Sequence, residues 1–143
     1  MAVENMTHWL FPANTKFYDV LAAFAETDTY WPSNAKLAVG DVAYIYLAAP
    51  YKQIGFVCDV AEVGLKQNSI MKYIRPFFKG EMDHKKPAKL FMKLKTRETV
   101  MLGGETPLDY KHLKQNGLNG MLMGPRKLEN NPILLNHIQG NLK

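Results

Sequence analysis

The sequence predicts a small mixed β-barrel of the α+β class, and three observations favour it. The expected elements run in the order strand, helix, two or three long strands, then short helices. Parallel βαβ repetition is absent, as are internal repeats and low-complexity linkers. The length of 143 residues is close to that of one ordinary domain, so we expect residues 1–143 to fold as a single domain around its own core.

The N-terminal part of the chain predicts one strand and one helix. The strand covers the short apolar stretch His8–Phe11. In the next segment, apolar residues recur at the i, i+3, i+4, i+7 spacing of one helix face, and Asn14 or Thr15 can cap its start. These apolar residues are Phe17, Val20, Leu21 and Phe24. The helix therefore has a clear core-facing side.

Three strands are expected in the middle of the chain. Val42–Ala48 follows a Gly-Asp turn at residues 40–41, and Ile54–Val63 follows the turn residues Tyr51–Gln53, so these two strands form a hairpin. Both are almost continuously apolar, which indicates that both of their faces are covered. A third strand with one basic outer face is expected where Leu90, Met92 and Leu94 alternate with Phe91, Lys93 and Lys95.

Two short helices are expected in the C-terminal third. For the first, Thr106 is the expected N-cap, Pro107 the first helical residue, Asp109 the second half of a capping box, and Gly117 the C′ residue. The second helix repeats this scheme with Asn131, Pro132 and Gly140. Between them, residues 120–125 form a strand or a packed loop.

Positive charge is concentrated in one segment. The chain carries a net charge of +5, and residues 66–97 alone hold ten Lys and Arg against two acidic residues. Within this segment, Asn68–Phe78 is aromatic and basic, and Gly80–Pro87 is a charged loop. Such a concentration is typical of a nucleic-acid-binding surface. A solvated lysine-rich loop accounts for the charge about as well.

The sequence also favours a cytoplasmic location. No basic region followed by an apolar stretch marks a signal peptide at the N-terminus. The longest apolar run, residues 42–50, is too short to span a bilayer, so no membrane partner is expected. The single cysteine, Cys58, excludes an intramolecular disulfide and fits a reducing compartment.

No catalytic constellation is visible, so we expect neither catalysis nor a cofactor. The histidines are far apart and form no zinc motif; they are His8, His84, His112 and His137. Cys58 lies within a strand pattern, where a cysteine is usually a small buried hydrophobe. Asp59 and Glu62 fall on opposite faces of an ideal strand, and Asp41 is most simply a turn former. Phosphate-binding and hydrolase motifs are absent.

The order of features in residues 8–63 resembles the EVE domain of the PUA-like superfamily, which also contains the YTH and ASCH domains. The matching stretches are HWLF with Trp9, the helix after it, YWPSNAK, VGDVAYIYLA and IGFVCDVAEVG. Further on, Lys95–Val100 and the stretch PLDYKHLKQNGLNGMLMGPRKLENNPILLNHI are similar to the C-terminal region of that domain. The chain departs from the family in having Lys36, not an arginine, near the Trp/Asn stretch, and in its lysine-rich segment 66–89.

The resemblance implies a PUA-like twisted mixed β-barrel flanked by short helices, with a pocket at one side. Related domains hold an extruded, modified base of DNA or RNA in such a pocket. An extruded base needs flat aromatic walls in place of its lost stacking, and fixed donors and acceptors that read its edge. The candidate pocket residues are Trp31, Ser33, Asn34, Trp9, Tyr46 and Tyr51.

Each candidate also has a plainer interpretation. Trp31 and Trp9 fit a core position about as well as a pocket wall, and turn chemistry after Pro32 accounts for Ser33. Tyr44 and Tyr46 share one strand face that can line either a pocket or the core. The candidate contacts to a nucleic-acid backbone are Lys52 in the hairpin turn and, in the basic segment, Lys72, Arg75, Lys79, Lys85, Lys86 and Lys89.

The function expected from the sequence is therefore non-catalytic nucleic-acid binding, with recognition of a modified or flipped base. DNA or RNA is the expected partner, and a nuclease or modification enzyme is a further partner that the resemblance allows. Two other classes stay open: an enzyme or enzyme accessory domain that acts on a small nucleotide-like ligand in the same pocket, and a protein-interaction module whose aromatic surface meets another protein.

Overall fold

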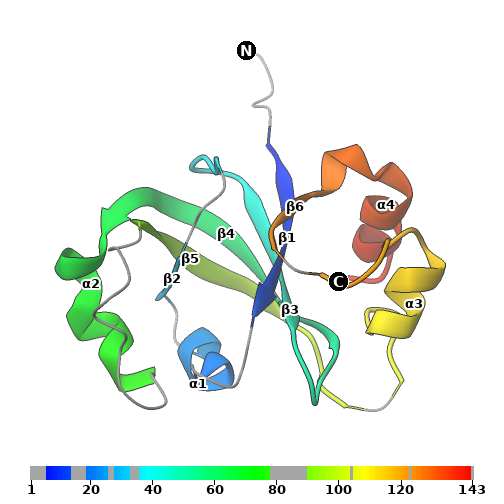
Figure 1. The fold of residues 1–143 in the computed structure, drawn as a ribbon, viewed down its shortest axis with the longest axis horizontal. Helices are drawn as coiled ribbons and strands as arrows, with labels where there is room; N and C mark the ends of the chain where they lie inside the picture. The colour runs from blue at the N-terminus through cyan, green and yellow to red at the C-terminus, as the bar shows by residue number, and fades with distance from the viewer. Residues whose placement is uncertain are drawn as a thin grey trace.

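The computed structural model describes residues 6–13, 19–25, 28–32, 36–77, 90–103, 105–122 and 124–142. A six-stranded sheet runs through the molecule in the order β2-β5-β4-β3-β1-β6 (Figure 1). The strands are β1 (His8–Ala13), β2 (Asp28–Pro32), β3 (Val42–Leu47), β4 (Gln53–Lys66), β5 (Leu90–Thr99) and β6 (Arg126–Lys127). The helices are α1 (Val20–Ala25), α2 (Gln67–Ile74), α3 (Tyr110–Gln115) and α4 (Pro132–Gly140), with the short 3₁₀ helices η1 (Arg75–Phe77) and η2 (Leu128–Asn130).

The sheet is mixed, which confirms the predicted α+β class. Strand β1 pairs in parallel with β3, and every other pairing between the named strands is antiparallel. The predicted hairpin is present as β3 and β4, and β4 extends to Lys66, three residues past the predicted end. Strand β2 and helix α2 are not among the elements that the sequence pattern predicts.

Strand β3 is buried along its whole length, as its continuous apolar run predicts. Its side chains alternate between two cores on the two faces of the sheet. The helix-side core, against α3 and α4, contains Leu10, Val42, Tyr44, Tyr46, Ile54, Val57, Leu108, Leu113, Leu118, Leu128, Leu134 and Ile138. The barrel core, against α1, contains Phe11, Ala13, Val20, Phe24, Ala43, Ile45, Leu47, Phe56, Cys58, Val60, Met92 and Leu94. Cys58 is thus a buried apolar residue, and burial raises the pKa of its thiol to about 12.

A third, smaller group of apolar side chains lies at the other end of the sheet. This outer cluster consists of Ile70, Ile74 and Phe91, with Tyr30, Leu65 and Met71 packed against it. It attaches α2 to strands β2 and β5, and Figure 1 shows α2 at the opposite end of the molecule from α3 and α4. Phe91 lies on the face opposite Met92 and Leu94, as the alternation of β5 predicts. The expected burial is wrong at the start of the strand, because Phe91 is buried under α2 and Leu90 is exposed.

The predicted N-cap is correct in α4 and wrong in α3. In α4, Asn131 accepts a hydrogen bond from the Leu134 N–H at 3.3 Å and Pro132 is the first helical residue, as predicted. In α3 the predicted cap is wrong: Asp109, not Thr106, is the N-cap, and its Oδ1 accepts from the His112 N–H at 2.9 Å. The carboxylate is the better acceptor, so the helix begins three residues later than expected.

A histidine–glutamate pair joins the start of β1 to η2. His8 Nδ1 lies 2.7 Å from Glu129 Oε2, and the His8 backbone N–H donates to both carboxylate oxygens at 3.0 Å. Partial burial opposes ionisation of Glu129, but the hydrogen bonds from the His8 side chain and backbone outweigh it and lower the pKa of that carboxyl.

Within the described ranges, no helix is long and apolar enough to cross a membrane.

The lowered pKa of Glu129 predicts a loss of stability in acid. The unfolded chain binds a proton at Glu129 more tightly than the folded chain does. The contribution of this carboxylate to the free energy of unfolding is therefore present above the ordinary glutamate pKa of about 4.3, and it is lost as pH falls through the lowered pKa of the folded state. When pH falls from about 6 to about 3, the free energy of unfolding measured with urea should decrease less for Glu129→Gln than for the native chain. Equal losses in the two proteins would contradict the assignment.

Candidate nucleic-acid interface

Trp9 is held in place by a buried carboxylate. Its Nε1–H donates to Asp41 Oδ2 at 3.1 Å, and Asp41 is only 4% exposed. The same carboxylate accepts from the backbone N–H groups of Ala38 at 3.0 Å and Thr7 at 3.1 Å. Asp41 is therefore more than a turn former, because it joins the turn before β3 to strand β1 and fixes the orientation of the indole.

Strand β2 sends its two aromatic side chains to opposite faces of the sheet. Trp31 packs against the barrel core, half-buried, with its ring centroid 5.4 Å from that of Phe24 and the planes tilted by 45°. Tyr30 packs into the outer cluster. The strand is fixed to α1 because the Thr29 hydroxyl donates to the Ala23 carbonyl at 2.7 Å. Trp31 thus sits on an edge strand, packed against Phe24 and partly exposed.

Tyr46 and Tyr51, the two tyrosines predicted to line the pocket, lie on opposite faces of the sheet. Tyr46 belongs to the helix-side core and is 8% exposed; burial, followed by the neighbouring Tyr110 and Asp109, raises its pKa to about 12. It is therefore separated by the sheet from Trp31. Tyr51 packs partly buried against the barrel core, and exposed Lys52 adopts a positive φ of 51°.

The predicted pocket residues therefore do not all come together. Trp9, Trp31 and Tyr51 border the barrel core, whereas Tyr46 packs on the other face of the sheet. The remaining predicted contacts, Ser33, Asn34, Lys79, Lys85, Lys86 and Lys89, lie outside the described residues. Their roles stay predictions.

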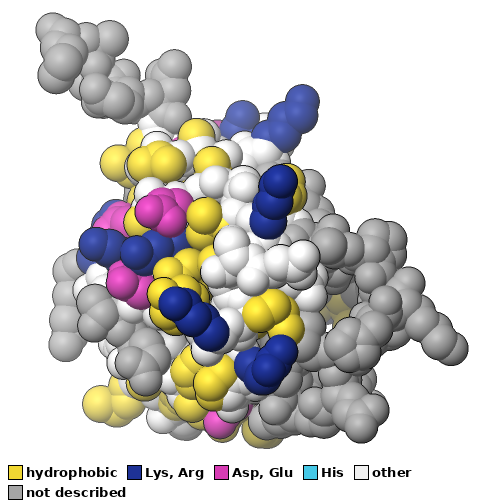
Figure 2. All heavy atoms as spheres, turned by 90° about the vertical axis from the view of Figure 1, so that its left-hand side faces the viewer, with side chains coloured by type: hydrophobic (Ala, Val, Ile, Leu, Met, Phe, Trp, Pro, Cys, Tyr) yellow, Lys and Arg dark blue, Asp and Glu magenta, His cyan; other side chains and the backbone are white. Residues whose placement is uncertain are grey.

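Two predicted backbone contacts, Lys72 and Arg75, lie on the surface of the outer cluster. The Tyr30 and Tyr73 rings stack there with centroids 5.1 Å apart and planes 17° from parallel. Lys72 Nζ lies 4.9 Å from the Tyr73 ring centroid. On the face shown in Figure 2, Lys and Arg side chains are interspersed with hydrophobic ones. Of the aromatic and basic residues predicted in 68–78, Lys72 and Tyr73 lie on α2, and Arg75 and Phe77 lie on η1 directly after it.

An acidic residue neutralises part of the positive charge near the outer cluster. Lys93 Nζ lies 3.6 Å from Asp28 Oδ2, and Asp28, followed by Tyr30, raises the pKa of Lys93. Among the described residues, Lys66, Lys72 and Arg75 form no ion pair. These three cations near α2 are therefore available to meet an external anion.

The other polar contacts are explained by structural roles. His112 Nδ1 lies 2.7 Å from Asp109 Oδ1 beside the α3 cap, and His137 Nε2 lies 2.7 Å from the Pro107 carbonyl. In the part of the chain that the structure describes, no group of His, Cys, Asp and Glu could hold a metal ion. The sequence could not reveal the His8–Glu129 pair, because 121 positions separate its members.

Comparison with solved structures identifies the fold. A variant of ASCH from Zymomonas mobilis superposes with a TM-score of 0.68 at 10% identity, over 99% of this chain and 100% of that chain. The fold is PUA-like. A hypothetical protein from Leishmania major gives a TM-score of 0.57 at 15% identity, over 97% and 99% of the two chains. Human THYN1, solved in complex with DNA containing 5-methylcytosine, gives 0.50 at 11% identity, over 76% and 74%. No family model and no curated protein matches the sequence.

The Asp41 anchor predicts a clear difference between two aspartates. Asp41→Asn should lower the free energy of unfolding by about 1.5–3 kcal/mol. The substitution replaces one carboxylate oxygen by an NH₂ group, which cannot accept the hydrogen bonds that N–H groups donate there in the native protein. The control Asp59→Asn removes a surface pair with Arg97 and should cost less than about 1 kcal/mol. Urea unfolding measures both, and equal costs would contradict the anchoring role.

Proposed function

We propose that this domain binds nucleic acid without catalysing a reaction on it, and that it reads an extruded base against Trp31. The observation that carries the proposal is the setting of Trp31: a half-buried indole on an edge strand, packed against Phe24. Packing on one side fixes the ring, and the accessible part can replace the stacking that a base loses on extrusion.

The fold and the charge support the same function. Human THYN1 shares the PUA-like fold and binds DNA that contains 5-methylcytosine. The EVE-type stretches in residues 8–63 are the finer basis for proposing a modified base as the ligand of this chain. The excess of Lys and Arg in residues 66–97 would supply the attraction to phosphates that does not depend on sequence.

The test is a binding screen by fluorescence anisotropy. DNA and RNA oligonucleotides, single-stranded and duplex, carry either cytosine or 5-methylcytosine and are titrated at about 50 mM and about 200 mM salt. The native chain should bind more weakly at the higher salt and prefer one form of the base. Trp31→Ala should remove that preference, with about 1–3 kcal/mol of binding free energy, and keep the salt dependence.

Two controls separate recognition from folding. Trp31→Phe keeps a flat ring and should retain most of the preference, whereas Trp31→Leu keeps the packing on Phe24 but should lose it. Thermal unfolding of each variant identifies any loss of fold. Binding to none of the oligonucleotides at low salt would overturn the proposal, and an unchanged base preference in Trp31→Leu would overturn the role of Trp31.

A further inference from the structure

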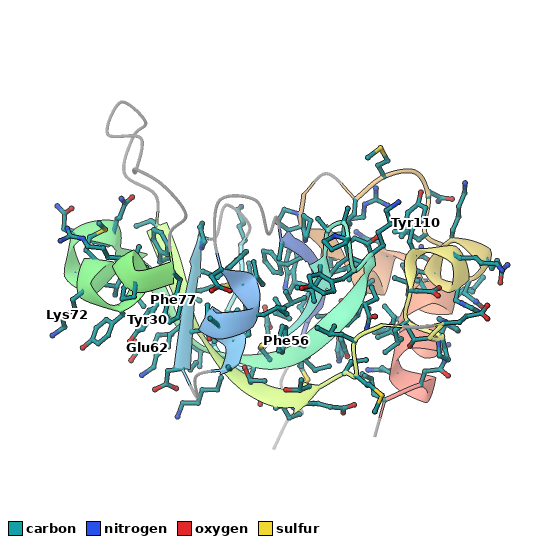
Figure 3. The ribbon with its side chains drawn as sticks, turned by 90° about the horizontal axis from the view of Figure 1, so that it is seen from below. Tyr30, Phe56, Glu62, Lys72, Phe77 and Tyr110 are labelled. Atoms are coloured by element: carbon teal, nitrogen blue, oxygen red, sulfur yellow. The ribbon has the colours of Figure 1, made fainter. Side chains whose placement is uncertain are left out.

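The outer cluster exposes an aromatic ring that its packing does not require. Ile70, Ile74 and Phe91 are buried, and Tyr30 already covers them from β2. Tyr73 stacks outside Tyr30 and is 47% exposed. Figure 3 shows Tyr30, Phe77 and Lys72 close together at this end of the molecule, far from Tyr110 on α3. The strand fixes one ring of the stacked pair and the helix fixes the other.

One cation contacts this ring, and two more lie near the ends of the same helix. Lys72 lies over Tyr73, and Arg75 is exposed one residue after α2 ends. Lys66 precedes the helix and pairs in register with Leu90, an exposed apolar residue. The surface therefore combines a flat apolar group with positive charges that form no ion pair among the described residues, and Glu62 lies at the same end of the molecule (Figure 3).

We propose that Tyr73, Lys72 and Arg75 form a second binding surface, which takes the single strand that flanks the base held at Trp31. The inference rests on the function proposed above and extends it to the strand outside the pocket. A phosphate gives the Lys72 ammonium a stronger partner than the ring, so binding would draw the cation away and uncover the ring for a base.

The chemistry of the surface favours a single strand over a duplex. In a duplex both faces of a base are covered by its neighbours, so only an unpaired base can stack on an exposed ring. Tyr30 and Trp31 are consecutive on the β2 edge and face opposite sides of the sheet. A strand that crosses this edge would meet both aromatic surfaces. Insertion into a membrane is disfavoured because Ile70 and Ile74 of α2 are already buried in the protein.

The test uses a fluorescein-labelled oligothymidylate of about twelve nucleotides, within the length that such surfaces cover. Tyr73→Ala should weaken its binding about five-fold or more, and the matched control Tyr73→Phe, which keeps the ring, should bind like the native chain. Lys72→Ala combined with Arg75→Ala should make the slope of log affinity against log salt shallower by about 1.4. Lys114→Ala changes an exposed lysine on α3 at the other end of the molecule, and it should leave the salt slope closer to the native value than the double change does.

The outcomes separate this inference from the proposed function. Loss of oligothymidylate affinity in Tyr73→Ala, with the base preference of Trp31 intact, supports the second surface. Native affinity in Tyr73→Ala overturns it, even if Trp31 still reads the base. If Tyr73→Ala unfolds, an unchanged salt slope in the Lys72 and Arg75 variant overturns it instead. Binding of the native chain to phosphatidylserine vesicles but not to oligothymidylate overturns the second surface, whereas the proposed function falls only if the cytosine and 5-methylcytosine oligonucleotides also fail to bind.

Discussion

Burial of both faces of β3 is the constraint on which the rest of the structure depends. Because six consecutive side chains of this strand are inside the protein, the sheet must be covered on both sides. Helices α3 and α4 cover one face, and α1 with the neighbouring aromatic residues covers the other. Side chains on each strand are then assigned to a face by the alternation of the strand. This assignment separates Tyr46 from Trp31, although both carry aromatic rings suited to a pocket.

The same alternation explains why the two aromatic residues of the stretch YWPSN lie on opposite faces of the sheet. Its first three residues belong to β2, an edge strand, so the aromatic pair is divided between the barrel core and the outer cluster. Trp31 has a fixed position because it packs on Phe24, and Tyr30 has one because it stacks on Tyr73. Two flat surfaces on either side of one sheet edge suit a ligand that is itself a chain of flat groups.

Strong local signals were enough to predict part of this structure. The continuous apolar runs gave β3 and β4, and Asn131–Pro132 gave the start of α4. Strand β2 was not predicted because an edge strand of five residues with two aromatics and a proline has no clear alternation. Helix α2 is not predicted because its eight residues contain one repeat of the helical spacing, Ile70 and Ile74, and no residue that caps its start through a side chain. The contacts of Asp41 and His8 join distant segments, which no local pattern reveals.

Photocrosslinking tests the central claim, that nucleic acid crosses the β2 edge, most directly. A single-stranded oligonucleotide with 5-iodouracil in place of thymine forms covalent adducts with aromatic side chains that stack on the base. After irradiation of the bound complex and proteolysis, mass spectrometry should find the adducts on peptides that contain Trp31 and Tyr73. Adducts confined to α3 and α4, under conditions in which the oligonucleotide binds, would contradict the account.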